Sequence, residues 1–130
     1  MLLDDLVTYI ANAGLGTPGT DLFAGSRTVH APVKCITLAE YNGTPPARTS
    51  AGIVSENPRV QVRIRDKEYP DARNTAEALY KLLDGVANTT IGTTRYQFIE
   101  ALAPPALLGA DESGNTEIVI NLAIKKGLSA

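Results

Sequence analysis

The sequence is poor in the residue types that build catalytic and metal sites, with one cysteine and one histidine among 130 residues. A single cysteine excludes an internal disulfide and a cysteine-rich zinc site. His30 and Cys35 are an odd number of positions apart, so on an extended segment they would point to opposite faces, which argues against a nucleophilic pair. We expect Cys35 to be a small core residue and His30 a loop residue. No spacing typical of metal ligands is present, and we expect neither a metal nor a cofactor.

The sequence also lacks a charge excess and a long apolar run. Its formal net charge is −2, so no basic surplus points to a nucleic-acid partner or an anionic membrane. No apolar stretch approaches the roughly 18 residues of a membrane-spanning helix. The first residues, MLLDDLVTYI, carry acids where a secretory signal would carry lysine or arginine. The sequence therefore predicts a protein made in a cytosol-like setting, without a membrane partner.

The composition is that of an ordinary globular domain, with 44% hydrophobic and 20% charged residues. A chain of this length buries roughly two thirds of its extended surface on folding, enough for one core. No internal repeat or linker interrupts it. We therefore expect residues 1–130 to form a single domain.

Two stretches have the period of amphipathic helices, and each ends at a glycine. In the first, apolar residues recur at helical spacing and Gly14 follows as the stop. The second spans residues 70–84 and precedes Gly85. The apolar stripes consist of Leu3, Leu6, Val7 and Ile10 in the first, and Ala72, Ala76, Leu79, Tyr80 and Leu83 in the second.

Several stretches indicate strands, separated by turn-forming residues. The clearest is RVQVRIR at 59–65, which alternates apolar and polar residues as a half-buried antiparallel strand does. Residues 42–58 contain Asn-Gly, Pro-Pro, Ala-Gly and Asn-Pro, which predict a long loop of the kind that often carries function. The remaining strands are expected at 21–25, 35–41, 95–102 and 117–126. This order predicts an α+β fold, a mainly antiparallel, mixed sheet of about four to five strands covered by two α-helices.

The segment GLGTPG at residues 14–19 has the spacing of a dinucleotide-binding fingerprint. A true fingerprint follows a strand and opens a helix, so that the phosphates meet the helix N-terminus. Here a helix precedes the glycines and a short strand follows. We therefore interpret the segment as a helix stop and a turn.

Two charged groups have more than one interpretation. The arginines of 59–65 form either a solvated strand face or a subunit or ligand interface, because arginine is enriched at protein contacts. Asp111 and Glu112 could form a carboxylate pair, but Ser113, Gly114 and Asn115 beside them favour a turn.

The ordered combination of several phrases resembles the bacteriophage minor capsid protein family, which includes tail terminator and tail completion proteins of long-tailed phages. The resemblance covers most of the chain and is weakest at residues 26–34. No single motif is diagnostic. The matching phrases are GLGTPG with DLFAG at 21–25, EYNGTPP at 40–46, residues 58–66, AEALY at 76–80 running to Gly85, and TRY at 94–96 running to Leu102 with GADE at 109–112.

The resemblance implies a structural virion protein without catalytic residues. It implies a hexameric ring of identical subunits that caps the tail tube, stops its polymerisation and joins it to the head-tail connector protein. The tail tube protein would be the second partner, and genome DNA would pass through the lumen without specific recognition. The protein would be assembled in the host cytoplasm and reside at the head-tail interface of the virion.

A closed ring requires two different, complementary patches on each subunit. We expect residues 42–58 and the arginine-bearing strand to supply the subunit or partner interface, through Arg48, Ile53, Val54, Arg59, Arg63 and Arg65. Three alternatives stay open at this point. They are a head-tail joining or head completion protein of the same fold, a small nucleotide-binding enzyme, and a host-derived adaptor domain.

Overall fold

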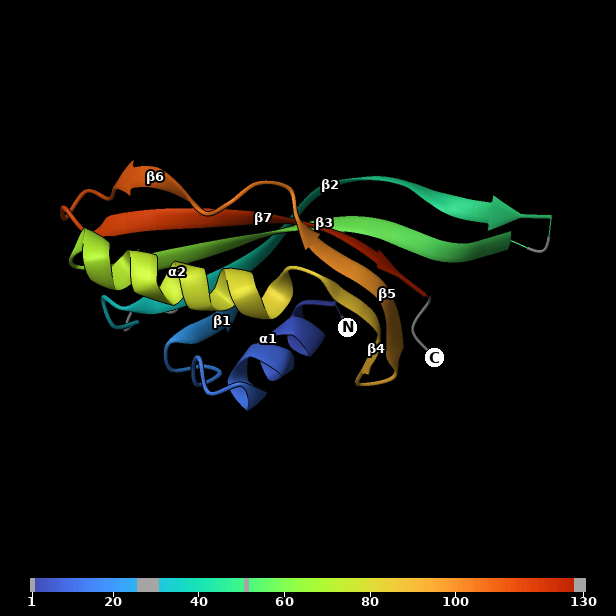
Figure 1. The fold of residues 1–130 in the computed structure, drawn as a ribbon, viewed down its shortest axis with the longest axis horizontal. Helices are drawn as coiled ribbons and strands as arrows, with labels where there is room; N and C mark the ends of the chain where they lie inside the picture. Colours follow the sequence, from blue (N-terminus) through green and yellow to red (C-terminus); the bar gives the residue numbers. More distant parts are fainter. Residues whose placement is uncertain (1, 26–30, 51, 128–130) are drawn as a thin grey trace.

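The computed structural model describes residues 2–25, 31–50 and 52–127, which form two helices packed on a mixed β-sheet (Figure 1). His30 lies outside the described residues. None of the described helices has the length and apolar character needed to cross a membrane. The elements are α1 (Leu2–Asn12), β1 (Leu22–Ala24), β2 (Cys35–Thr49), β3 (Gly52–Asp66), α2 (Tyr69–Leu83), β4 (Val86–Ile91), β5 (Thr94–Ala101), β6 (Ala106–Ala110) and β7 (Thr116–Lys126).

Both helices form where the apolar periodicity predicts them. The predicted stripe of α1 is buried, and Gly14 adopts a positive φ of 78° just beyond the helix, as a stop residue does. α2 begins with Pro70 in its first turn, where proline loses no helical hydrogen bond. It ends before Gly85, whose φ of 86° breaks the helix. Within α2, Ala72, Ala76, Leu79 and Leu83 are buried and Tyr80 is partly buried.

The described sheet has seven strands, so the expectation of four to five was too low. Its order is β1-β2-β3-β7-β5-β4, with β6 also paired to β7. β1 and β2 run parallel, and the other pairs are antiparallel. β4 was missed because VANTTI has too few apolar residues to alternate, and β6 because ALLGA has no alternation and follows two prolines. The α+β class with an antiparallel-dominated mixed sheet is confirmed.

The last strand, β7, lies at the centre of the sheet. It pairs with β3 along one side, and with β6 and then β5 along the other. Its inward side chains Ile118, Ile120, Leu122 and Ile124 are buried in the core, together with residues of both helices. Figure 1 shows α1 and α2 on the same side of the sheet. We call the opposite side, which carries Arg59, Arg63 and Arg65, the outer face.

A polar contact ties the first helix to the far part of the sheet. The hydroxyl of Tyr96 on β5 donates a hydrogen bond to Oδ2 of Asp5 on α1 at 2.8 Å. Tyr96 is fully buried, and burial, followed by the nearby Asp5 carboxylate, raises the pKa of its hydroxyl. The tyrosine therefore stays neutral and keeps its donor.

The described residues 42–50 and 52–58 do not form the long loop that their turn-forming residues predict. They continue β2 and β3 as a paired two-stranded extension. Beyond residue 38, β2 has no described partner other than β3, so prolines can occupy its free edge without breaking a ladder. Register shifts between Tyr41 and Thr44, and again before Arg48, absorb the irregular sequence.

Candidate functional site

The most prominent surface feature is the projecting part of the β2–β3 hairpin, residues 42–57, which we call the arm. Figure 1 shows it extending from the body of the molecule at one end of the long axis. The arm takes eight residues of β2 and six of β3, which give it a reach of about 20 Å. Among the arm residues whose side chains the structure describes, Ser55 is buried and none belongs to the hydrophobic core cluster. Most of the described arm is therefore accessible to another chain.

Local contacts hold the arm in its hairpin form. The side-chain amide of Asn57 donates to the carbonyl of Pro45 at 2.9 Å across the bulged region. At Gly43 a Cβ atom would collide with the backbone carbonyl of Asn57, so only glycine permits this close approach. The arm is thus already ordered as two paired strands, which lowers the entropy lost when a partner binds.

An ion pair fixes the base of the arm to the central strand. Nζ of Lys126 lies 3.1 Å from Oε1 of Glu56, and the two residues are also register partners between β3 and β7. Lys126 is buried and Glu56 is partly exposed. Beyond this pair, the described residues of the arm pair only with each other.

Three of the predicted interface residues lie near the tip of the arm. Arg48 on β2 is exposed and stands opposite Ile53 on β3, and Val54 is the next residue along β3. Arg48 is the one charged residue between Tyr41 and Ser55 in the sequence. The structure therefore brings the predicted arginine and the apolar pair together in one small region.

Arg59 and Arg63 lie on the outer face, as the alternation of the strand predicts. Arg63 is exposed, and its Nε donates to Oε1 of Gln61 at 3.0 Å. Gln61 in turn donates to Oδ1 of Asn121 on β7 at 3.1 Å. Arg59 is partly exposed and stands opposite Tyr41, which is exposed, at the base of the arm. Both arginines can therefore be reached from outside the subunit.

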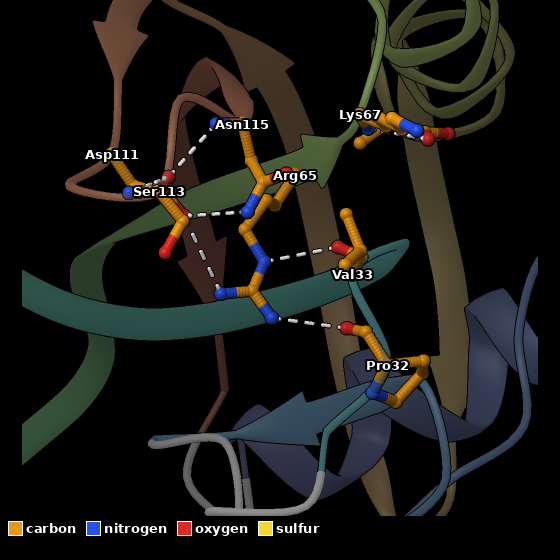
Figure 2. Close-up of polar contacts among 8 residues, drawn as sticks. Pro32, Val33, Arg65, Lys67, Asp111, Ser113 and Asn115 are labelled. Atoms are coloured by element: carbon orange, nitrogen blue, oxygen red, sulfur yellow. Dashed lines mark hydrogen bonds and ion pairs between the residues drawn. The ribbon is translucent and has the colours of Figure 1, made fainter.

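Arg65 is engaged within its own subunit, as Figure 2 shows. Its Nε donates to the carbonyl of Val33 at 2.9 Å and its Nη2 to the carbonyl of Pro32 at 3.0 Å. Its Nη1 lies 3.6 Å from Oδ2 of Asp111. The side chain therefore joins the segment before β2 to the turn between β6 and β7. A role of Arg65 in contacts between subunits remains a prediction.

We expect Arg65→Ala to lower the free energy of unfolding by roughly 1–3 kcal/mol, because it leaves two backbone carbonyls without their donor and removes the cation beside Asp111. Arg63→Ala, on the same strand and face, should change it by less than about 0.5 kcal/mol. Urea unfolding at equal protein concentration measures both. Equal losses for the two variants would contradict the assignment of Arg65 to a structural role.

The turn between β6 and β7 is organised by Asp111, as its sequence predicts (Figure 2). Oδ1 accepts hydrogen bonds from the backbone N–H groups of Asn115 and Ser113 at 2.8 and 3.0 Å, and Oδ2 accepts one from the Asn115 side chain at 3.1 Å. The bonds from Asn115, then the bond from Ser113 and the charge of Arg65, hold the pKa of Asp111 below its ordinary value.

This lowered pKa predicts the pH range in which the turn is stable. A carboxyl group whose folded pKa is lowered stabilises the fold above its unfolded value of about 4, and the effect is lost as the pH falls through the folded value. We expect the amide NMR signals of Ser113 and Asn115 to stay constant from pH 7 to about 5 and to move with a midpoint below the ordinary value of about 4. In an Asp111→Asn variant this transition should be absent. Movement already near pH 5 would contradict the lowered pKa.

The GLGTPG segment has no phosphate cradle. The N–H groups of Gly14, Leu15 and Gly19 donate to backbone carbonyls of their own chain, and that of Thr17 donates to Oδ1 of Asp21 at 2.6 Å. In a true fingerprint such groups point at the ligand. An open groove does lie beside the segment, lined in part by Asp21, Lys34 and residues of α2. The segment is the helix stop and turn that the order of elements predicts.

Other candidate chemistry is limited in the part of the chain that the structure describes. No group of three or more His, Cys, Asp or Glu residues could hold a metal ion among residues 2–25, 31–50 and 52–127. Cys35 is buried, as expected of a core cysteine. Its predicted lack of pairing with His30 is not tested, because His30 is not described.

A comparison of the sequence with protein-family profiles identifies the family to which this chain belongs. The sequence profile of a family described as "Bacteriophage tail terminator protein" matches residues 9–127. The chain belongs to the bacteriophage tail terminator family. The match begins in the last part of α1 and includes α2, the arm and all strands, so it concerns most of the fold rather than one motif.

A solved structure agrees with this family in fold. A chain from "Virion of native gene transfer agent (GTA) particle" superposes with a TM-score of 0.68 at 12% sequence identity. The alignment covers 92% of this chain and 84% of that chain. No curated protein sequence matches. The tail terminator family places the chain in the virion tail as a structural component and not as an enzyme.

Sequence reasoning missed one apolar surface of this tail terminator. Leu102, Leu107 and Leu108, between β5 and the end of β6, are exposed. The sequence does show a leucine pair between Pro104-Pro105 and the polar turn at 111–115. That pair was assigned no role because the segment was interpreted as a loop.

Proposed function

We propose that the protein caps the tail tube as a closed, hexameric ring of identical subunits, stops tube polymerisation and joins the tail to the head-tail connector protein. The observation that carries this proposal is the arm, a preformed hairpin in a member of the tail terminator family that adds nothing to the core of its own subunit. Such an element has its use in a contact with another chain.

A ring of like subunits needs one patch that binds a different patch on the neighbour. The arm, with Arg48, Ile53 and Val54, is one such patch. The outer face with Arg59 and Arg63 is available as a second contact, toward the neighbour or toward the tail tube protein. A stable interface should bury at least about 1,000 Å² in total, which a hairpin of this length can reach together with part of a sheet face.

The proposal also includes the path of the genome DNA. Genome DNA passes through the lumen of the ring without specific recognition. The net charge of −2 supports this, because a protein that grips the phosphate backbone carries a basic surplus.

Two measurements test the proposed function. Native mass spectrometry of the purified protein should give one closed species with a mass of six subunits. Electron microscopy of particles assembled without the protein should show overlong tails detached from heads. Tails of normal length with detached heads would replace capping by a joining role, and normal virions would remove both roles.

A further inference from the structure

The structure leaves one edge of the sheet open and apolar. Among the described residues, β6 pairs with β7 alone, so the backbone groups along its other side have no strand beside them. Its sequence is ALLGA, without a charged side chain. Leu107 and Leu108 are 59% and 48% exposed, and Leu102 before them is 47% exposed.

An edge of this kind is unusual for a free subunit. Exposed edge strands are normally protected from pairing by lysine, proline or a bulge, because their free backbone groups attract other strands. Here Pro104-Pro105 precede the strand and a register shift falls at Leu108, but the strand carries no lysine and both of its leucines are exposed. These features are typical of a strand that becomes covered on assembly.

The position of this edge points to a second copy of the chain as the element that covers it. Figure 1 shows β6 and the arm at opposite ends of the long axis. An arm at one end and an acceptor edge at the other form a head-to-tail pair, the arrangement from which rings are built. Strand addition to an open edge supplies main-chain hydrogen bonds, and the arm offers an extended backbone with free outer edges.

The charges of the two ends are complementary. Near β6, the N-terminal part of α2 is held to the segment that leads into β6 by a hydrogen bond from Nη1 of Arg73 to the carbonyl of Pro105 at 2.8 Å. The exposed acids Glu68, Asp71 and Glu112 outnumber the exposed bases Lys34 and Lys67 at this end. The tip of the arm carries a single charge, the positive Arg48. Opposite charges on two patches favour their encounter and suppress pairing of like ends.

We propose that the arm of one copy lies along the free edge of β6 of the next copy and covers Leu107 and Leu108. This inference rests on the proposed ring and names the two surfaces that close it. The pairing is heterologous, since an arm contacts an edge and never another arm.

Cysteine cross-linking tests the contact directly. Ser50→Cys at the arm tip and Ala106→Cys on β6 are introduced together into a Cys35→Ala chain, and the protein is treated with a short bismaleimide. We expect a ladder of cross-linked species that ends at the mass of the ring. The two single-cysteine chains should give no ladder, because each contact requires one cysteine of each kind. A ring that forms normally but gives no ladder overturns this inference and leaves the proposed ring intact.

A substitution at the edge gives an independent test. Leu107→Lys places a charge in the covered strip and should raise the dissociation constant for assembly about tenfold or more, as loss of an interface anchor does. Val33→Lys, at a residue 44% exposed on the segment before β2, which is not paired with β6, is the matched control and should leave assembly unchanged. Circular dichroism should show both variants folded. Equal assembly of the two variants overturns the inference, and a wild-type protein that stays monomeric overturns the proposed ring itself.

Discussion

A variant in which residues 42–58 are replaced by Asn-Gly is expected to fold but to remain monomeric at concentrations where the wild type assembles. Tyr41 and Arg59 are register partners, so a two-residue turn can join them directly. The arm contributes no residue to the core cluster, and removal should therefore spare the fold. Lys126 loses Glu56 but gains access to water, which limits the cost of the lost ion pair.

Sedimentation velocity measures the assembly of this variant, and tail length in micrographs measures its function. We expect tails made with it to be as long as those made without the protein. Arg48→Lys, which keeps the arm and its charge, is the control and should assemble. A shortened chain that still forms the ring would show that the interface lies elsewhere on the subunit.

The second large effect is expected in the core beneath the sheet. Leu79→Ala in α2 should lower the free energy of unfolding by about 2–5 kcal/mol, because Leu79 is fully buried and its removal leaves a cavity. Leu82→Ala, in the same helix but only partly buried, should cost clearly less. Denaturant unfolding at one fixed protein concentration compares them, since assembly stabilises the folded state by mass action.

Equal losses for the two leucine variants would contradict the burial pattern of α2. The same comparison separates folding from assembly. Leu79→Ala should weaken the ring only as far as it depopulates the folded subunit, whereas removal of the arm should abolish the ring in a folded subunit.

Residue periodicity predicted the elements that pack against the core. The stripes of Leu6 and Ile10 in α1 and of Leu79 and Leu83 in α2 are buried as expected, because burial itself imposes the period. β3 and β7 were found for the same reason, since one side of each lies on the helices.

The arm could not be predicted in this way, because none of its described residues packs in the hydrophobic core cluster. Its conformation depends on cross-strand pairing, on the Asn57–Pro45 bond and on the space that Gly43 leaves. Pro45 and Pro46 would disrupt a central strand, so the sequence favours a loop there. On the free edge of a strand, however, prolines are tolerated. Sequence reasoning therefore assigned the wrong local structure to the segment that carries three of the candidate interface residues.

Arg65 shows a second limit of sequence reasoning. It has the same spacing and side chain as Arg59 and Arg63, so the sequence groups the three together. Only the chain path brings Pro32, Val33 and Asp111 to its guanidinium group. Contacts between residues far apart in sequence separate one arginine from the others.

The central position of β7 has a consequence for synthesis of the chain. Ribosomes release the N-terminal parts first, so the β2–β3 and β4–β5 hairpins emerge before the strand that connects them through the sheet. Until residues 116–126 appear, the two hairpins share no strand, and these late, long-range pairings set the pace of folding. Incomplete translation products therefore lack a finished sheet, and only full-length chains become competent building blocks.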